Sequence, residues 1–192
     1  MSKLLRVAAI LSLIAPAFAP GTRAAESEAG QPSYINCEYG FAIIFPRPPM
    51  TRDVRYTTST GATVPARQFY LENGADRLMV TVATFTGGPI IDEKEMDHAA
   101  ATLSMRGEVR FRERGIYDPG FPGRQLNIFL PNNRQLRASV YMIERRLFIT
   151  EALAAVSDFV ALQFEQSISI ISPTGVDYDQ NPGDPLRVFP CR

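Results

Sequence analysis

Apolar residues alternate with polar ones, or form short runs, along most of the chain from Tyr39 onward, and this pattern is typical of β-strands. The aromatic and β-branched run from Phe41 to Phe45 ends at Pro46, which predicts a first core strand. A weaker pattern over Val54 to Thr58 predicts a second strand. The first part of the domain is therefore expected to be sheet.

The clearest unit is a hairpin around Asn73 and Gly74. These two residue types tolerate the positive φ angles of a tight turn, and here they separate two strand patterns, Val64 to Glu72 and Arg77 to Phe85. Both alternating faces of the second strand are apolar. We therefore expect this strand to be central in the sheet and covered on both sides.

Two segments have the periodicity of helices. Asp92 and Glu95 have the spacing of a capping box, and a helix is predicted from about Glu93 to Arg106. Ser157 and Asp158 are expected to start a second helix. The apolar positions of this second helix that should lie on the sheet are Phe159, Leu162 and Ile168.

Further strand patterns follow the first helix and are separated by short turns. They cover Val109 to Arg114, Arg124 to Phe129, Arg134 to Ile143 and Arg146 to Leu153. The order of elements is strands, helix, strands, helix. Since neighbouring strands are joined by short turns, we predict an α+β fold in which two main helices pack on a mostly antiparallel sheet.

The first 24 residues read as a signal peptide. Lys3 and Arg6 precede an apolar run from Val7 to Ala19, which is too short to span a bilayer that needs roughly twenty residues. Small residues favour cleavage after Ala24, and the alternative is a buried N-terminal helix. We expect a signal peptide over 1–24, one globular domain over 25–172, and a periplasmic or secreted product without a transmembrane segment.

The two cysteines, Cys37 and Cys191, lie near opposite ends of the mature chain. An oxidising compartment favours a disulfide between them, which would tie back the extended, proline-rich tail over residues 173–192. A redox-active pair and a metal site are the alternatives. Redox pairs usually have C-x-x-C spacing, and a metal needs more ligands than two thiols and one histidine.

The charge balance bears on the kind of partner. The chain has 20 basic and 20 acidic residues, and Lys3, Arg6 and Arg23 would leave with the signal, so the mature chain is mildly acidic. This argues against a general binder of nucleic acids or of anionic membranes.

Several segments resemble the PsbP-like family of exported or lumenal domains. The resemblance rests on Tyr39 to Pro46, on Gly123-Arg124, on Arg137 to Leu153 and on Phe164 to Ser167. It implies an α/β/α sandwich and a non-catalytic accessory or binding role. No functional residues carry over from it.

Candidate catalytic groups are few. His98 is the single histidine and is expected to face solvent on the first helix, and the nearby acidic residues are expected to favour the start of that helix through its dipole. No nucleophile, nucleotide or metal motif occurs, so no catalytic residue, metal or cofactor is predicted. The sequence leaves open a carboxylate pair for glycoside hydrolysis, for which the examples are Glu108, Glu113 and Glu151.

One constellation has the character of a binding site. Arg110, Arg112 and Arg114 alternate along a predicted strand, which would place three guanidinium groups on one face for an anion or an acidic partner. The alternative is a solvated face whose charges discourage edge pairing. Other arginines expected on nearby strands are Arg134, Arg137, Arg145 and Arg146.

Together these patterns predict an exported, non-enzymatic binding or accessory protein of the bacterial envelope, whose partner is an envelope protein or a small ligand. The alternatives are a small-ligand binder, a periplasmic hydrolase with an unrecognised carboxylate site, and a structural component of an envelope complex.

Overall fold

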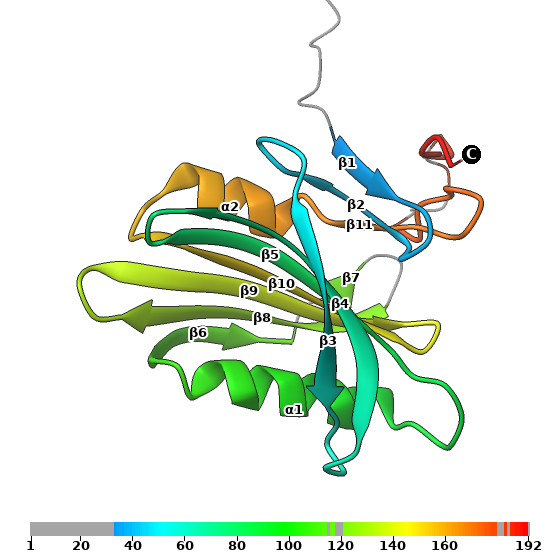
Figure 1. Ribbon diagram of the computed structural model, residues 1–192, viewed down its shortest axis with the longest axis horizontal. Helices are drawn as coiled ribbons and strands as arrows, with labels where there is room; N and C mark the ends of the chain where they lie inside the picture. The colour runs from blue at the N-terminus through cyan, green and yellow to red at the C-terminus, as the bar shows by residue number, and fades with distance from the viewer. Residues whose placement is uncertain (1–32, 115, 118–120, 180–182, 184, 192) are drawn as a thin grey trace, which may run out of the picture.

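The fold was established from a computed structural model, which describes residues 33–114, 116–117, 121–179, 183 and 185–191. The predicted signal peptide and its cleavage site lie outside these residues. Within them the chain forms an α+β fold of antiparallel strands and two helices, as the sequence predicted (Figure 1). The strands are divided between two sheets, which the sequence did not predict.

The main sheet has eight strands, and each of its pairings among the described residues is antiparallel. Its strands, in spatial order, are β3 (Met50–Thr57), β4 (Thr63–Asn73), β5 (Asp76–Thr84), β10 (Arg146–Ala155), β9 (Arg134–Ile143), β8 (Phe121–Leu130) and β6 (Glu108–Glu113), with β7 (Ile116–Tyr117) also paired to β8. Within the described chain, β3 and β6 are therefore the two edges of this sheet.

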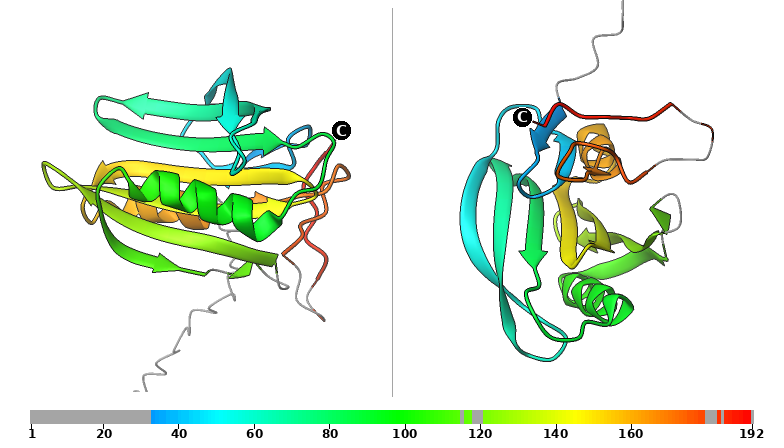
Figure 2. Two further views of the ribbon diagram at one scale, coloured as in Figure 1. Left: turned by 90° about the horizontal axis from the view of Figure 1, so that it is seen from below. Right: turned by 90° about the vertical axis from the view of Figure 1, so that its right-hand side faces the viewer.

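The helices lie on opposite faces of the main sheet. Helix α1 (Asp92–Ser104) contacts β8, β9 and β10 from one side, whereas α2 (Phe159–Gln166) contacts β9 and β10 from the other. The side of α2 also carries a three-stranded sheet of β1 (Ser33–Asn36), β2 (Phe41–Ile44) and β11 (Ser169–Ile170). Figure 2 shows these layers from two further directions.

The predicted hairpin is confirmed, but its turn lies one residue further along than predicted, because Asn73 is the last residue of β4. Strands β4 and β5 pair from Ala66 opposite Ala83 to Asn73 opposite Asp76, so that Gly74 and Ala75 form the two-residue turn. The alternating faces of β5 enter different cores, because Val80 packs on the α2 side and Ala83 on the α1 side. As expected, β5 is a central strand that is covered on both faces.

The alternation of the strands divides the apolar residues between these two cores. The core on the α2 side is rich in aromatic residues and includes Phe41, Phe45, Phe69, Phe148 and Phe164. The core under α1 is mostly aliphatic and includes Met96, Leu103, Leu126, Ile128, Leu136 and Leu147.

The start of α1 differs from the predicted capping box. The N-cap residue is Ile91, which makes no side-chain cap, and Asp92 is already helical. Glu95 is buried, and its carboxylate accepts hydrogen bonds from the backbone N–H and the hydroxyl of Ser59. The carboxylate of Glu95 therefore fixes the β3–β4 turn to the helix instead of capping α1.

The second helix starts as predicted, because the side chain of Asp158 accepts from the N–H groups of Val160 and Ala161. Its buried face is different. Phe159 is 70% exposed, so the prediction that it packs on the sheet is wrong; the helix instead buries Ala161 and Phe164. The cap at Asp158 sets the helix phase and turns Phe159 toward solvent.

The disulfide between Cys37 and Cys191 is present. It joins the chain after β1 to the end of the tail, whose Phe189 is buried beside Ala42 and Ile171. The backbone of the tail also bonds to itself, from Asp177 N–H to Arg187 O and from Phe189 N–H to Gly175 O. The tail is therefore folded back onto the small sheet.

Candidate functional site

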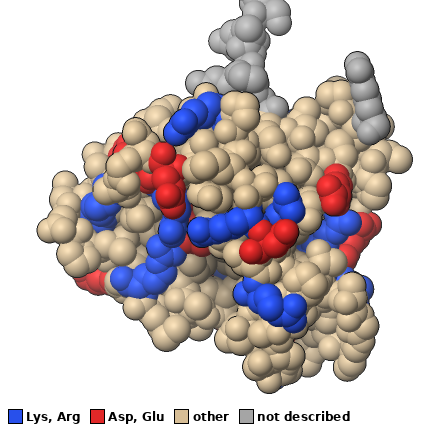
Figure 3. All heavy atoms as spheres, viewed as in Figure 1, with Lys and Arg blue, Asp and Glu red and all other residues tan. Residues whose placement is uncertain are grey.

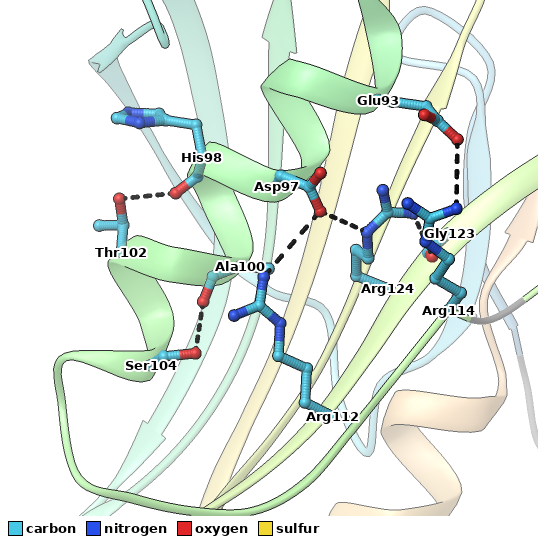
Figure 4. Close-up of polar contacts among 10 residues, drawn as sticks. All are labelled: Glu93, Asp97, His98, Ala100, Thr102, Ser104, Arg112, Arg114, Gly123 and Arg124. Atoms are coloured by element: carbon cyan, nitrogen blue, oxygen red, sulfur yellow. Dashed lines mark hydrogen bonds and ion pairs between the residues drawn. The ribbon is translucent and has the colours of Figure 1, made fainter.

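The most concentrated set of interacting charges lies between α1 and the adjacent strands β6 and β8. Glu93 and Asp97 are one turn apart on α1, so their side chains lie on one side of the helix. Arg112 and Arg114 come from β6 and the residue that follows its end, and Arg124 comes from β8. Figure 4 shows these five residues, which we call the arginine cluster.

Arg124 is the innermost member of the arginine cluster, with its side chain only 2% exposed. Its Nε donates to Oδ1 of Asp97 at 2.7 Å, and its Nη1 donates to the backbone oxygen of Gly123 at 2.8 Å. Its Nη2 is buried and has no hydrogen-bond partner among the described residues. A buried donor without a partner is costly, so this nitrogen favours an additional acceptor.

The two outer arginines are held loosely. The guanidinium of Arg112 lies 3.9 Å from Asp97, and that of Arg114 lies 3.9 Å from Glu93. Both distances exceed the range of a hydrogen bond. Their side chains are 42% and 73% exposed, respectively. Because they make no closer polar contact with a described residue, both guanidinium groups can turn toward a ligand at small cost.

The charges of the cluster act together on Asp97. The hydrogen bond from Arg124 lowers the pKa of its carboxyl, burial opposes this effect, and the charges of Arg124, Arg112 and Arg114 lower the pKa further. Asp97 is therefore ionised at neutral pH. Three guanidinium groups then face two carboxylates, which leaves an excess of positive charge for an anion.

The structure brings together only part of the predicted arginine stripe. A register shift between Val109 and Phe111 interrupts the alternation of β6. Arg110 lies over the ring of Phe129, with 5.3 Å between its Cζ and the ring centroid, and bonds to Glu108. The expectation that the three guanidinium groups share one face is corrected by this bulge, which separates Arg110 from Arg112 and Arg114.

Three of the other arginines named from the sequence, Arg134, Arg137 and Arg145, have partners elsewhere. Arg134 pairs with Asp76, and Arg137 pairs with Glu165 of α2. Arg145 donates to the backbone oxygens of the segment after β5, including that of Phe85. None of these contacts belongs to the arginine cluster.

The suggested carboxylates for glycoside hydrolysis do not come together. Glu151 is buried on β10 and pairs with Arg77 and Arg106, whereas Glu108 and Glu113 are exposed on β6. Strands β9 and β8 lie between β10 and β6. Three strand spacings of about 4.8 Å exceed the roughly 5–9.5 Å that separates the two carboxyl groups of such enzymes.

The sequence predicted that His98 faces solvent, but the structure shows it half-buried against β3. A ring nitrogen lies 3.1 Å from the backbone oxygen of Thr57, and its ring lies edge-on to that of Tyr56. His98 projects from the side of α1 away from the arginines (Figure 4). In the part of the chain that the structure describes, no three His, Cys, Asp or Glu side chains gather as a metal site would require.

Sequence reasoning missed Arg124 as a site residue. The signal for it was present, because Arg124 shares its strand face with Leu126 and Ile128, both of which belong to the core under α1. An arginine on the apolar face of a strand indicates a buried charge with a specific partner. The partner, Asp97, could not be identified without the position of α1.

Charged side chains also extend over the surface beyond the arginine cluster. On the face drawn in Figure 3, basic side chains form a band across the middle, and acidic side chains interrupt it at several points. Charges of both signs are thus interleaved on this face.

Comparisons with known proteins found no matching family model, no matching curated protein and no matching solved structure. The resemblance to the PsbP-like family therefore stays a prediction. None of the helices described here is both long enough and apolar enough to span a membrane.

Proposed function

We propose that this chain is an exported, non-enzymatic binding or accessory protein of the bacterial cell envelope, which recognises an anionic group at the arginine cluster. The observation that carries the proposal is the buried guanidinium of Arg124, whose Nη2 lacks a partner among the described residues. The exposed guanidinium groups of Arg112 and Arg114 supply further donors beside it.

The chemistry of the guanidinium group supports this reading. Its planar fork of N–H donors matches the paired oxygens of a carboxylate or a phosphate, and hydrogen bonds between charged groups are stronger than neutral ones. An anion at Arg124 would give Nη2 its missing acceptor. It would also offset the excess of positive charge that remains after Glu93 and Asp97 are counted.

The proposed compartment has separate support. A disulfide persists in oxidising compartments and is rare in the cytosol, so the Cys37–Cys191 bond fits an exported protein. The charged, apolar and small-residue order of the first 24 residues fits a signal peptide.

Affinity capture from bacterial envelope extract tests the proposal. The bait is the mature chain, compared with an Arg112→Ser/Arg114→Ser variant and with a matched Arg52→Ser/Arg55→Ser control. Arg52 and Arg55 lie on β3, the opposite edge of the sheet, and bond to Gln68 and Thr63 of β4. The control therefore removes two exposed edge arginines while leaving the cluster intact.

The expected result is one envelope partner that the parent and the β3 control retain, that the cluster variant loses, and that salt elutes. Retention by all three baits would place the interaction elsewhere on the molecule. Capture by none of them would contradict the proposal as well.

A small-ligand binder is the second candidate, because the structure contains a cavity of about 440 Å³, which is within the usual range for ligand pockets. It lies between the β4–β5 hairpin and the start of α2, with an apolar floor that includes Leu71, Leu78 and Ala161. Binding of the fluorescent probe 1-anilinonaphthalene-8-sulfonate tests this cavity. Val160→Trp should fill it and reduce binding, whereas Phe159→Trp, at the exposed neighbour that does not line the cavity, should not.

A further inference from the structure

The backbone of β6 offers a second kind of contact beside the arginine cluster. Among the described strands, β6 pairs only with β8, and all six of its residues are exposed. The N–H and C=O groups along its outer side are therefore available to an added strand. Extended segments of partner proteins bind in this way, with main-chain hydrogen bonds that supply affinity.

The side chains of β6 present different chemistry on its two faces. Arg112 is opposite Leu126, which belongs to the core under α1, so Arg112 lies on the α1 side together with Arg124. Phe111 is opposite Asn127 on the other side and is 42% exposed. An added strand would therefore place alternate residues against cationic and aromatic side chains.

The opposite edge of the sheet is different in this respect. On β3 the guanidinium of Arg52 donates to Gln68 at 2.6 Å, and that of Arg55 donates to the hydroxyl of Thr63. These arginines are already bonded to the neighbouring strand. Among the described residues, Arg112 and Arg114 make only the long contacts to α1 given above, so their donors can turn toward a partner.

The same charges select against a second copy of β6. Two β6 strands paired edge to edge would bring arginine close to arginine, which is destabilising. The bulge at Arg110 also limits regular pairing to the part of the strand from Phe111 onward. Carboxylates on a partner would instead be attracted to Arg112 and Arg114. The partner residue between those carboxylates would lie on the face of Glu113 and Phe111, where an apolar side chain can contact the Phe111 ring and a further carboxylate would be repelled by Glu113.

We infer that the partner presents its anionic groups on an extended segment of alternating acidic and apolar residues, which adds to the main sheet along β6. This inference rests on the proposed function, because it uses the same arginines, and it adds the requirement for backbone pairing.

The test uses two synthetic nonapeptides. One alternates Val and Glu, and the other has the same sequence with every backbone nitrogen methylated. The methylated peptide keeps each carboxylate and loses each backbone donor. Dissociation constants are measured for the disulfide-bonded mature protein, for Arg112→Ser/Arg114→Ser and for the Arg52→Ser/Arg55→Ser control. Amide hydrogen exchange is measured in parallel over β6 and β3.

We expect methylation of the peptide to weaken binding at least about tenfold, and loss of Arg112 and Arg114 to weaken it by at least about tenfold. The β3 control should bind like the parent. Exchange should slow over residues 111–113 when the unmethylated peptide binds, and should not change over β3.

Equal affinity for the two peptides, with dependence on Arg112 and Arg114 retained, would overturn strand addition while leaving anion recognition in place. Binding that does not depend on these arginines, or no binding of either peptide, would also overturn the inference. A different result would contradict the proposed function, namely capture of the same envelope partners by the parent and by the Arg112→Ser/Arg114→Ser variant.

Discussion

Arg124 and Asp97 form an asymmetric pair: the guanidinium on β8 is buried, whereas the carboxylate on α1, whose Oδ1 lies 2.7 Å from Nε, is 49% exposed. The exposed carboxylate is thus the main charge that compensates a buried one. The contact also joins α1 to the sheet beside the edge strand β6. Stability and binding at this site are therefore coupled.

Removal of the Asp97 carboxylate alone should lower the free energy of unfolding more than removal of both Asp97 and Arg124. We expect Asp97→Ala to lower the free energy of unfolding by about 2 kcal/mol, because it leaves the Arg124 guanidinium buried with only the Gly123 oxygen. The double variant Asp97→Ala/Arg124→Met should lose less, since Met fills the space without a charge. Urea denaturation measures both values, and a double variant that is less stable than Asp97→Ala would contradict this account.

The same contact should make stability depend on pH. The pKa of Asp97 is held below its usual value of 3.8, first by the hydrogen bond from Arg124. A depressed pKa in the folded state stabilises above the unfolded-state pKa, and this contribution is lost as pH falls through the folded-state value. The stability difference between the parent and Asp97→Asn should therefore be constant from pH 7 to about 5 and should shrink below about pH 4. A difference that persists unchanged at about pH 2 would show that the charge of Asp97 is not responsible.

The strands were predictable where a local pattern determines them. The alternation over Arg124 to Phe129 and over Arg134 to Ile143 predicted β8 and β9, although β8 begins earlier, at Phe121. The two strands are joined by a turn in which Asn132 and Asn133 both have positive φ. Strands β1 and β11 were not predicted. Both are short. Strand β1 pairs with β2 across the turn at residues 37–40, whereas β11 follows the second helix, so its pairing with β2 depends on a contact between distant parts of the chain.

The arginine cluster was only partly predictable for the same reason. Alternation correctly predicted that Arg112 and Arg114 lie on one face, because side chains two residues apart on a strand point to the same side. The bulge that separates Arg110 from them arises from pairing with β8 and has no signature in β6 itself. Arg124 required knowledge of which strand lies next to β6, which the local pattern does not contain.

Two glycines with similar backbone angles should respond differently to substitution. Gly175 has φ +85°, and an added Cβ would lie 2.1 Å from the backbone oxygen of Phe189; Gly61 has φ +82° with nothing within 4 Å. Gly61→Ala should cost about 1 kcal/mol of backbone strain, whereas Gly175→Ala should cost roughly 3 kcal/mol because it also displaces Phe189. Thermal unfolding of the two variants measures the difference. An equal loss of stability in the two variants would mean that the tail does not pack against Gly175.

Loss of the disulfide should release the tail before it unfolds the sheet. The bond joins cysteines 154 residues apart, for which the chain-entropy model gives an upper value of about 5 kcal/mol. We expect Cys37→Ser/Cys191→Ser to lower the free energy of unfolding by roughly 3–5 kcal/mol. Since residues 185–191 reach the small sheet through Phe189, which is buried beside Ala42 and Ile171, and through the disulfide itself, amide exchange should accelerate first over residues 185–191 and β1. Reduction of the parent with dithiothreitol should reproduce the effect without any substitution. A variant as stable as the parent, with unchanged exchange in the tail, would show that packing of Phe189 holds the tail and that the disulfide is not required.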